Sequence, residues 1–480
     1  MFEEEKKPFL LTLFGASGDL AKLKLFPALF ALMAQKRLPK HFLIIGYARS
    51  KKTREEFQHE FLQSIEKSCR QQKTRIAFCK KTAQELLRRV HYFSGEYGNV
   101  KDFERYKKAL PRFARQSGIP LPRMHVAYFS VPPSVFQPIV HNLALTRKNE
   151  REDIRIVLEK PFGEDTASAK KLFHFISRFF PEDHIFLLDH YLGKTAVQSI
   201  LTLRHNNAIL NMLLKGKEIS SIQITAHETV GVEDRAGYFE HVGVIKDMFQ
   251  SHLTQILAMI TMSIPITADA KSFHREKYAI LSALDFSARA ENIYLGQYEG
   301  YRDIKGVSPH SHTETYFAAK LKIDRESWYG VPIFVRTGKK LAKKCTTVVV
   351  EFKKLPFQKD IEPNRLIFEL QPREMIHIKL INQYGQSSEY HEIGTSESIA
   401  CRGRECLPEH ALLLLDVLKN KRLHFLSFPE IIASWKITDT ILHFVKRNKN
   451  IQLHQYPQGV SCPEEVRHIF RKKNEYWIDV

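Results

Sequence analysis

Two short runs of residues carry the side chains that chemistry needs. The run DHYLGK at 189–194 puts an acid, an imidazole, a phenol and an ammonium within six residues. Near the start of the chain, GASGDLAK at 15–22 has two glycines three positions apart, with an alanine in the place of a third. Together the two runs predict a nucleotide-dependent enzyme that acts on a small anionic, hydroxylated substrate.

The glycine run stands where a nucleotide-binding loop is expected. It follows a short apolar run, Phe9 to Phe14, and precedes the apolar periodicity of a helix that extends to Met33. Glycines let the backbone approach a pyrophosphate, and the N-terminus of the following helix attracts its negative charge. The alternative is a tight turn between a strand and a helix. The nucleotide interpretation assigns cofactor contacts to Gly15, Ala16, Ser17, Gly18, Asp19 and Leu20.

The end of the second strand indicates which dinucleotide binds. An NAD site normally places an acidic side chain there, to bind the 2′-hydroxyl of the ribose. In this chain the strand FLIIG at 42–46 runs into YARS at 47–50, which contains no acid. A guanidinium suits the 2′-phosphate of NADP, so Arg49 favours NADP as the cofactor. The alternative is an ordinary surface arginine at the end of a strand.

The composition is that of a globular protein. Of its residues, 43% are apolar and 26% are charged. A chain of 480 residues is too long for one ordinary hydrophobic core, so we expect two domains. No run reaches the roughly 18 to 20 consecutive apolar residues that a membrane helix needs. The first residues, MFEEEKKPFL, lack the apolar segment of a signal peptide. We therefore expect a cytoplasmic protein without a membrane partner.

The net charge of +20 raises the hypothesis of nucleic-acid binding. The lysines and arginines are spread along the chain, and no helix-turn-helix, zinc-finger or RNA-recognition signature accompanies them. A basic surface also attracts phosphorylated substrates and cofactors. We therefore do not expect nucleic acid as a partner.

The six cysteines form no Cys-x-x-Cys pair. Cys401 and Cys406 are close in the sequence, but no second pair of cysteine or histidine ligands joins them. We expect reduced structural thiols and no metal site.

The first part of the chain alternates short apolar strands with charged helical segments. Beyond the two strands at 9–14 and 42–46, strands are predicted at 125–130, 154–158 and 185–188. This alternation is typical of a doubly wound parallel sheet of the α/β class. We assign residues 1–190 to a Rossmann-like, NADP-binding domain.

After residue 190 the pattern changes to alternating strands in succession. They are predicted at 219–227, 313–323, 331–336, 346–352, 365–370 and 376–381, with one long helix over 238–264. This pattern predicts an α+β domain with a mostly antiparallel sheet. We assign residues 191–480 to substrate binding and dimerisation, and we expect ligands to bind where two domains meet.

The two opening runs belong to a longer series of motifs. In order, the chain carries GASGDLAKLKLFPALF, GYARS, SVPP, EKPFG, DHYLGK, RTGKKL and the QP after NRLIFEL. This series resembles the glucose-6-phosphate dehydrogenase family. The segment GVEDRAGYFEHVGVIKDMFQSHL resembles that family's long central helix and the loop before it. Seven motifs in one order are far more specific than any single motif.

The resemblance implies oxidation of D-glucose 6-phosphate to 6-phospho-D-glucono-1,5-lactone, the first step of the oxidative pentose phosphate pathway. Hydride leaves C1 of the sugar for NADP while a base takes the proton of the C1 hydroxyl. By motif match that base is His252, and Asp189 is the partner that fixes its tautomer. The alternative is a packed histidine, since His252 shares a helix face with Phe249 and Ile256.

The resemblance also implies which side chains hold the ligands. The phosphate is assigned to His190, Tyr191, Lys194, Lys339 and Lys344, because cationic and hydrogen-bonding groups suit a dianion. The sugar hydroxyls are assigned to Lys160, Glu228, Asp247 and Gln371, and further cofactor contacts to Lys24 and Lys160. The alternative for the lysine cluster around 339–344 is exposed surface charge.

Three departures from the family pattern lie near these positions. Ser251 replaces the usual asparagine before the histidine, Glu240 a usual aspartate, and Glu369 a usual basic residue before QP. A dehydrogenase of a different sugar phosphate is therefore one alternative. A basic binding protein on an inactive enzyme scaffold is the other. The family pairs its large sheets across a two-fold axis, so we expect a homodimer or a dimer of dimers.

Overall fold

The computed structural model describes residues 7–71, 76–147, 153–355, 361–383, 390–401, 406–470 and 475–480. The chain forms two compact units: Met1–Lys194 with Arg402–Phe428, and Thr195–Cys401 with Pro429–Val480. The sequence pattern predicts one domain after residue 190, whereas the second segment of the first unit returns to it from later in the chain. Its helix, α12 (Glu409–Leu418), has an ordinary apolar face, and such a face does not reveal which core it joins.

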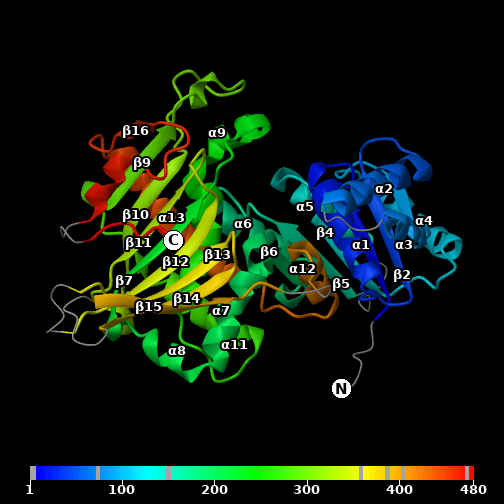
Figure 1. The fold of residues 1–480 in the computed structure, drawn as a ribbon. Helices are drawn as coiled ribbons and strands as arrows, with labels where there is room; N and C mark the ends of the chain where they lie inside the picture. Colours follow the sequence, from blue (N-terminus) through cyan, green and yellow to red (C-terminus); the bar gives the residue numbers. More distant parts are fainter. Residues whose placement is uncertain are drawn as a thin grey trace. The chain divides into compact units, whose positions relative to one another are not determined.

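The first unit is built on a six-stranded sheet in the order β3-β2-β1-β4-β5-β6 (Figure 1). All neighbouring strands are parallel. This is the strand order of the Rossmann fold, in which ligands bind where the order reverses, between β1 and β4. The predicted α/β class is confirmed. The strands are β1 (Phe9–Phe14), β2 (Phe42–Ala48), β3 (Val90–Ser94), β4 (Met124–Phe129), β5 (Asp153–Glu159) and β6 (Ile185–Leu188).

Helices connect these strands and cover a continuous core. Every residue of β1 is buried, as expected for a strand in the middle of a parallel sheet. Helix α12 joins the same core through Leu413 and Leu414. The other helices are η1 (Ala21–Leu25, a π-helix), α1 (Phe26–Ala34), α2 (Arg54–Gln71), α3 (Ile76–Leu87), α4 (Val100–Gln116), α5 (Phe136–Leu145) and α6 (Thr166–Ser177).

The cysteines correct one prediction. Cys69 in α2 and Cys79 in α3 form a disulfide, so the expectation of reduced thiols is wrong for this pair. Cys401 and Cys406 are disulfide-bonded as well. Spacing along the chain could not show that two successive helices bring their thiols together. Among the described residues, Cys345 and Cys462 are free thiols.

The second unit is built on one ten-stranded sheet, which curves from β15 to β16 in Figure 1. The order is β15-β14-β13-β12-β7-β11-β10-β9-β16, and β8 pairs with β10. Among the strands of the described residues in this sheet, only β7–β11 and β9–β16 are parallel pairs, which confirms the mostly antiparallel sheet. The strands are β7 (Ile219–His227), β8 (Leu284–Asp285), β9 (Ile293–Tyr298), β10 (Tyr316–Ile323), β11 (Ile333–Gly338), β12 (Cys345–Phe352), β13 (Arg365–Gln371), β14 (Met375–Gln383), β15 (Tyr390–Ser398) and β16 (Leu453–Tyr456).

The single long helix predicted over 238–264 is wrong. Gly243, at φ +67°, breaks it near the end of α9 (Ala236–Val244), and beyond the break η7 (Ile245–Leu253, a π-helix) continues into α10 (Thr254–Thr261). Periodicity alone suggested one helix because apolar residues continue across the break. The other α-helices of the described residues in this unit are α7 (Thr195–Asn206), α8 (Ala208–Leu213), α11 (Ala270–Leu281) and α13 (Phe428–Arg447). Within the described ranges, no helix is both long and apolar enough to cross a bilayer.

Candidate active site

The predicted ligand-binding residues of the first unit follow the carboxyl ends of its strands. The glycine loop follows β1, Arg49 follows β2, Lys160 follows β5 and Asp189 follows β6. Because the strands are parallel, these ends share one edge of the sheet. Strands β5 and β6 are neighbours, so Lys160 and Asp189 leave adjacent strands. The fold therefore brings these predicted residues of the first unit to a common edge.

The glycine loop has a conformation that requires glycine. Gly15 has φ +83°, and a Cβ built on it would lie 2.0 Å from the carbonyl oxygen of Ser130. The Gly15 N–H donates to the Tyr47 carbonyl at 2.9 Å, and the Gly18 N–H donates to the Gly15 carbonyl at 2.9 Å. The loop lies at the switch point of the sheet, and its bare backbone fits the close approach of a dinucleotide pyrophosphate.

Arg49 is an exposed cation on a supported segment. Its guanidinium carbon lies 5.9 Å from the centroid of the Tyr97 ring, and its carbonyl oxygen accepts from Ser94 Oγ at 3.3 Å. Both contacts come from residues at or after the end of β3, the strand beside β2. The position beyond β2 is thus occupied by a positive charge, where an NAD site would have a carboxylate.

The DHYLGK run forms a short 3₁₀ helix, η4 (His190–Gly193), directly after β6. Asp189 is fully buried, and its Oδ1 accepts from the Tyr191 N–H at 2.9 Å. Lys194 Nζ lies 3.4 Å from the centroid of the Tyr191 ring, and the His190 and Tyr191 rings are 5.1 Å apart. The segment gathers an ammonium, an imidazole and a phenol, which is a suitable set for an anion.

The second unit carries a compact cluster of two acids and one lysine. Lys339 Nζ is 2.6 Å from Glu228 Oε2 and 3.2 Å from Asp247 Oδ2. Burial by itself lowers the pKa of Lys339, but Asp247 and Glu228 outweigh burial and raise that pKa above its ordinary value. The lysine is therefore held as an ammonium ion between two carboxylates.

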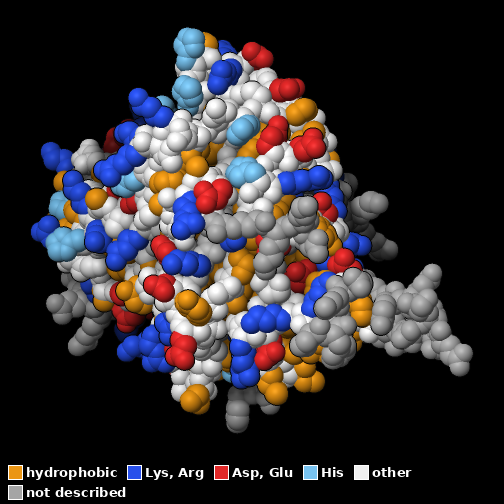
Figure 2. Space-filling view, turned by 90° about the vertical axis from the view of Figure 1, so that its left-hand side faces the viewer, with side chains coloured by type: hydrophobic (Ala, Val, Ile, Leu, Met, Phe, Trp, Pro, Cys, Tyr) orange, Lys and Arg blue, Asp and Glu red, His pale blue; other side chains and the backbone are white. Residues whose placement is uncertain are grey.

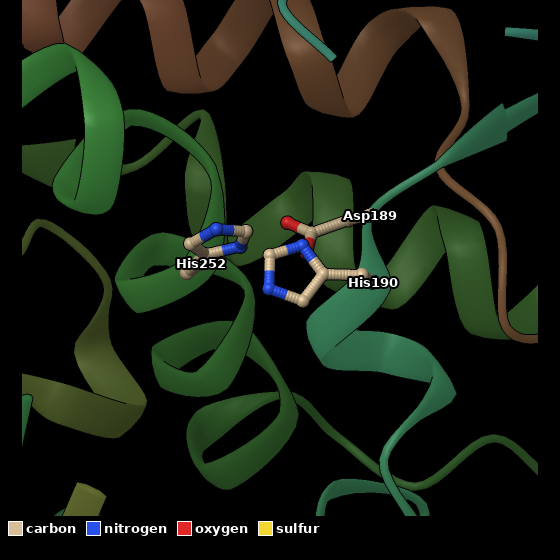
Figure 3. Close-up of side chains that lie close together, drawn as sticks. All are labelled: Asp189, His190 and His252. Atoms are coloured by element: carbon tan, nitrogen blue, oxygen red, sulfur yellow. The ribbon is translucent and has the colours of Figure 1, made fainter. Parts of the chain in front are cut away.

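His252 projects from η7 and is buried, with 1% of its surface exposed; Figure 3 shows it on that helix, and Asp189 and His190 at the end of β6. Asp247 and His252 are five residues apart on η7. The i to i+5 spacing of a π-helix brings residues five apart closer to one face than an α-helix does. The π-helix therefore presents both polar side chains more nearly together.

The remaining predicted residues have other surroundings. Gln371 ends β13, and its Oε1 accepts from Thr346 Oγ1 at 3.3 Å. Lys344 is exposed between β11 and β12. Lys24 is half-exposed, and its Nζ lies 3.4 Å from Glu409 Oε1.

Helix α12 adds residues that no sequence motif marks. Glu409 pairs with Lys24, and a Cβ on Gly193 would lie 2.7 Å from the Leu413 side chain. On the same helix, His410 Nε2 lies 3.6 Å from Glu159 Oε1, which also accepts from a buried tyrosine hydroxyl. These residues stand more than 200 positions from the residues they contact, and no motif spacing indicates the return.

Two of the family departures are explained by contacts within the second unit. Glu240 Oε2 accepts from Tyr301 Oη at 2.8 Å and from Ser311 Oγ at 2.9 Å, which anchors α9. Glu369 pairs with Arg373 Nη2 at 2.8 Å and lies 3.3 Å from a histidine of β14. Both acids therefore hold neighbouring elements in place.

Comparison with known proteins gives one consistent family. The models of the glucose-6-phosphate dehydrogenase NAD binding domain and C-terminal domain match residues 12–199 and 201–478. The chain is 33% identical to glucose-6-phosphate 1-dehydrogenase of Cyberlindnera jadinii, over 95% of this chain and 93% of that one. It is 32% identical to the Chlamydia pneumoniae protein of that name, over 98% and 96% of the two chains. A solved glucose-6-phosphate dehydrogenase in complex with its substrate glucose 6-phosphate has a similar structure, with a TM-score of 0.89, 31% identity and 98% of both chains covered.

Proposed function

The chain belongs to the glucose-6-phosphate dehydrogenase family, and on that premise we propose that it oxidises D-glucose 6-phosphate to 6-phospho-D-glucono-1,5-lactone with NADP. The observation that carries the proposal is the Asp189–Lys194 segment. It presents a cation, an imidazole and a phenol for a phosphate directly beside a buried carboxylate that suits a histidine base.

In the proposed reaction His252 takes the proton from the C1 hydroxyl of the sugar. The Asp189 carboxylate accepts a hydrogen bond from the imidazole, fixes its tautomer and stabilises the imidazolium that forms. NADP, when bound, accepts the hydride from C1. His190, Tyr191 and Lys194 hold the phosphate at the other end of the sugar, so that C1 is oriented by contacts remote from the reaction.

We assign the sugar hydroxyls to Glu228 and Asp247, whose carboxylates accept hydrogen bonds, with Gln371 and Lys160 as further contacts. Lys339 stands between the two acids at 2.6 and 3.2 Å, which supports a role in fixing both carboxylates. In this arrangement the exposed Lys344 attracts the phosphate electrostatically.

The choice of NADP rests on Arg49 and the glycine loop. The Arg49 guanidinium beyond β2, 5.9 Å from the centroid of the Tyr97 ring, suits a 2′-phosphate, and the loop from Gly15 to Leu20 suits the pyrophosphate. Lys24 and Lys160 supply further positive charge for the cofactor phosphates. Glu409 pairs with Lys24, so a bound cofactor competes with this carboxylate for the ammonium.

The alternative of a basic binding protein finds no support on the face drawn in Figure 2. There, lysines and arginines are interspersed with acidic, histidine and hydrophobic side chains, and they do not form one basic stripe. A dehydrogenase of another sugar phosphate remains the competing function, because it would use the same phosphate site and the same base.

We further propose a homodimer or a dimer of dimers that pairs the large sheets, in the cytoplasm. Ile378 and Leu380 on β14 are 37% and 47% exposed, which supports an apolar contact surface there. The C-terminal residues Ile478 and Val480 already pack against β12 and β13. Light scattering that gave the mass of one chain at working concentration would refute the dimer.

A substrate panel tests the proposed function. The protein is supplied with NADP and, in turn, glucose 6-phosphate, unphosphorylated glucose, galactose 6-phosphate and 6-phosphogluconate, and reduction of the nicotinamide is followed by absorbance. We expect kcat/KM for glucose 6-phosphate to exceed that for glucose at least about 100-fold, because the phosphate contacts are lost with glucose. Faster turnover of another sugar phosphate would move the assignment to that substrate.

A further inference from the structure

The helix that carries Asp247 and His252 is capped by a residue far along the chain. The first turn of a helix has backbone N–H groups without partners inside the helix. At the start of η7, the Val244 N–H donates to the carbonyl oxygen of Glu314 at 3.0 Å. The Ile245 N–H donates to Oε1 of the same residue at 3.1 Å. One glutamate therefore satisfies two successive donors.

The break at Gly243 makes room for this carboxyl group. A Cβ on Gly243 would lie 2.2 Å from Glu314 Oε1, and its φ of +67° is one that glycine adopts readily. The absence of a side chain at Gly243 lets the carboxyl group lie against the backbone where α9 ends. The kink at Gly243 and the cap of η7 therefore involve the same carboxyl group.

The same stretch of chain also holds Lys339. The Lys339 N–H donates to the carbonyl oxygen of Thr315 at 3.0 Å, and the hydroxyl of Tyr456 donates to the Lys339 carbonyl at 2.8 Å. Glu314 and Thr315 are adjacent. Glu314 therefore binds the start of η7 while its neighbour binds the residue after β11. These two attachments hold the helix that carries Asp247 close to Lys339, whose Nζ is 3.2 Å from Asp247 Oδ2.

Glu314 is partly buried. Burial raises the pKa of this carboxyl group to about 7, while the bonds from backbone N–H groups and the charge of Lys246 act against that rise. A large share of this carboxyl group is therefore uncharged near neutral pH. An uncharged side chain with the same acceptor oxygen should cap the helix in the same way.

We propose that Glu314 is a positioning residue of the sugar site. By capping η7 at the Gly243 break, it fixes Asp247 relative to Lys339, and it sets the start of the helix from which His252 projects. The consequence for turnover rests on the proposed function, whereas the cap itself does not.

Two substitutions separate positioning from general stability. Glu314→Ala removes the acceptor of the Ile245 N–H, and Glu314→Gln keeps it. The control is Asn292→Ala, which removes a buried amide that donates to the Ser287 carbonyl at 2.9 Å in the same unit, outside the sugar site. The readouts are kcat and KM for glucose 6-phosphate, KM for NADP, the melting temperature, and hydrogen exchange of the Ile245 amide.

We expect Glu314→Ala to lower kcat/KM for glucose 6-phosphate at least about tenfold, with KM for NADP within about twofold of wild type. Its Ile245 amide should exchange at least about tenfold faster. Glu314→Gln should restore both readouts to within about threefold of wild type. Asn292→Ala should lower the melting temperature without lowering kcat/KM.

Three results would overturn the inference: unchanged kcat/KM in Glu314→Ala, equal impairment in Glu314→Gln, or a matching loss in Asn292→Ala. If the wild-type chain did not reduce NADP with glucose 6-phosphate, the proposed function would fail instead. The exchange of the Ile245 amide would then still decide whether Glu314 caps η7.

Discussion

Lys339 and Glu228 face each other across the ends of two parallel strands, with Nζ 2.6 Å from Oε2. Strands β7 and β11 pair so that His227 lies opposite Gly338, and the residue after each strand therefore emerges beside the other. The Glu228 N–H also donates to the Gly338 carbonyl at 2.9 Å. Asp247 reaches the same ammonium from η7. Two carboxylates and one ammonium carry a net negative charge, which suits the hydroxyl groups of a sugar better than a phosphate.

This geometry predicts the effect of removing the Lys339 charge. Lys339→Met leaves Glu228 and Asp247 facing each other without a counter-ion, so their arrangement toward the sugar is lost. We expect kcat/KM for glucose 6-phosphate to fall at least about tenfold, measured by steady-state kinetics. The neighbouring Lys340 pairs with Glu233 at 2.8 Å, and Lys340→Met is the matched control that should stay near wild type. Equal effects of both substitutions would contradict the assignment.

The partly buried Glu314 predicts a dependence of stability on pH. Burial raises its pKa from the ordinary value of 4.5 to about 7, so the folded chain holds this proton where the unfolded chain releases it. Its contribution to stability is therefore complete below about pH 4.5 and is lost as pH rises through about 7.

The Glu314→Gln variant isolates this pH-dependent contribution of Glu314 to stability, because its amide does not titrate. Its free energy of unfolding relative to wild type should increase between pH 5 and pH 8, by roughly 2 kcal/mol. Denaturant unfolding of both proteins at the two pH values checks this. A constant difference between the proteins would show that Glu314 is ionised throughout.

Arg49 predicts the preference between the two dinucleotides. Arg49→Gln removes the charge that we assign to the 2′-phosphate, so KM for NADP should rise about tenfold or more while KM for NAD changes less than about threefold. Lys51→Gln, at an exposed position two residues on, is the control for loss of one nearby positive charge. A parallel rise in KM for both cofactors would remove Arg49 as the discriminating residue.

Gly15 predicts a site where one methyl group is not tolerated. Alanine there would adopt φ +83° and place its Cβ 2.0 Å from a backbone oxygen. Gly15→Ala should therefore lower the free energy of unfolding by at least about 2 kcal/mol and weaken NADP binding. Gly98→Ala is the matched control, because nothing lies within 4 Å of its added Cβ. Calorimetric titration with NADP and thermal unfolding measure both effects.

The sequence was informative wherever a local pattern decides the structure. The strand that ends at Phe14, the glycine loop after it and the alternating strand at 219–227 all follow from residue type and periodicity, and the structure contains each of them. The resemblance named Glu228, Asp247 and Lys339 separately, and the structure brings these three together.

Features that depend on distant parts of the chain could not be predicted. Glu314 lies 69 residues from the helix that it caps, and nothing around it in the sequence marks it. The Glu314 carboxyl group lies where a Cβ on Gly243 would stand, and the sequence around Gly243 does not show this contact either. In the same way, Cys69 and Cys79 meet because two helices pack together, and α12 returns to the first unit because its apolar face completes that core.

The most direct test of the account is absorbance at the reduced-nicotinamide band, with purified wild-type protein and His252→Ala, glucose 6-phosphate, and either NADP or NAD. The account predicts rapid reduction of NADP by the wild type, weaker use of NAD, and a loss of roughly 100-fold or more in kcat for His252→Ala. Folded wild-type protein that reduced neither cofactor, or a His252→Ala variant with unchanged kcat at saturating substrate, would contradict it.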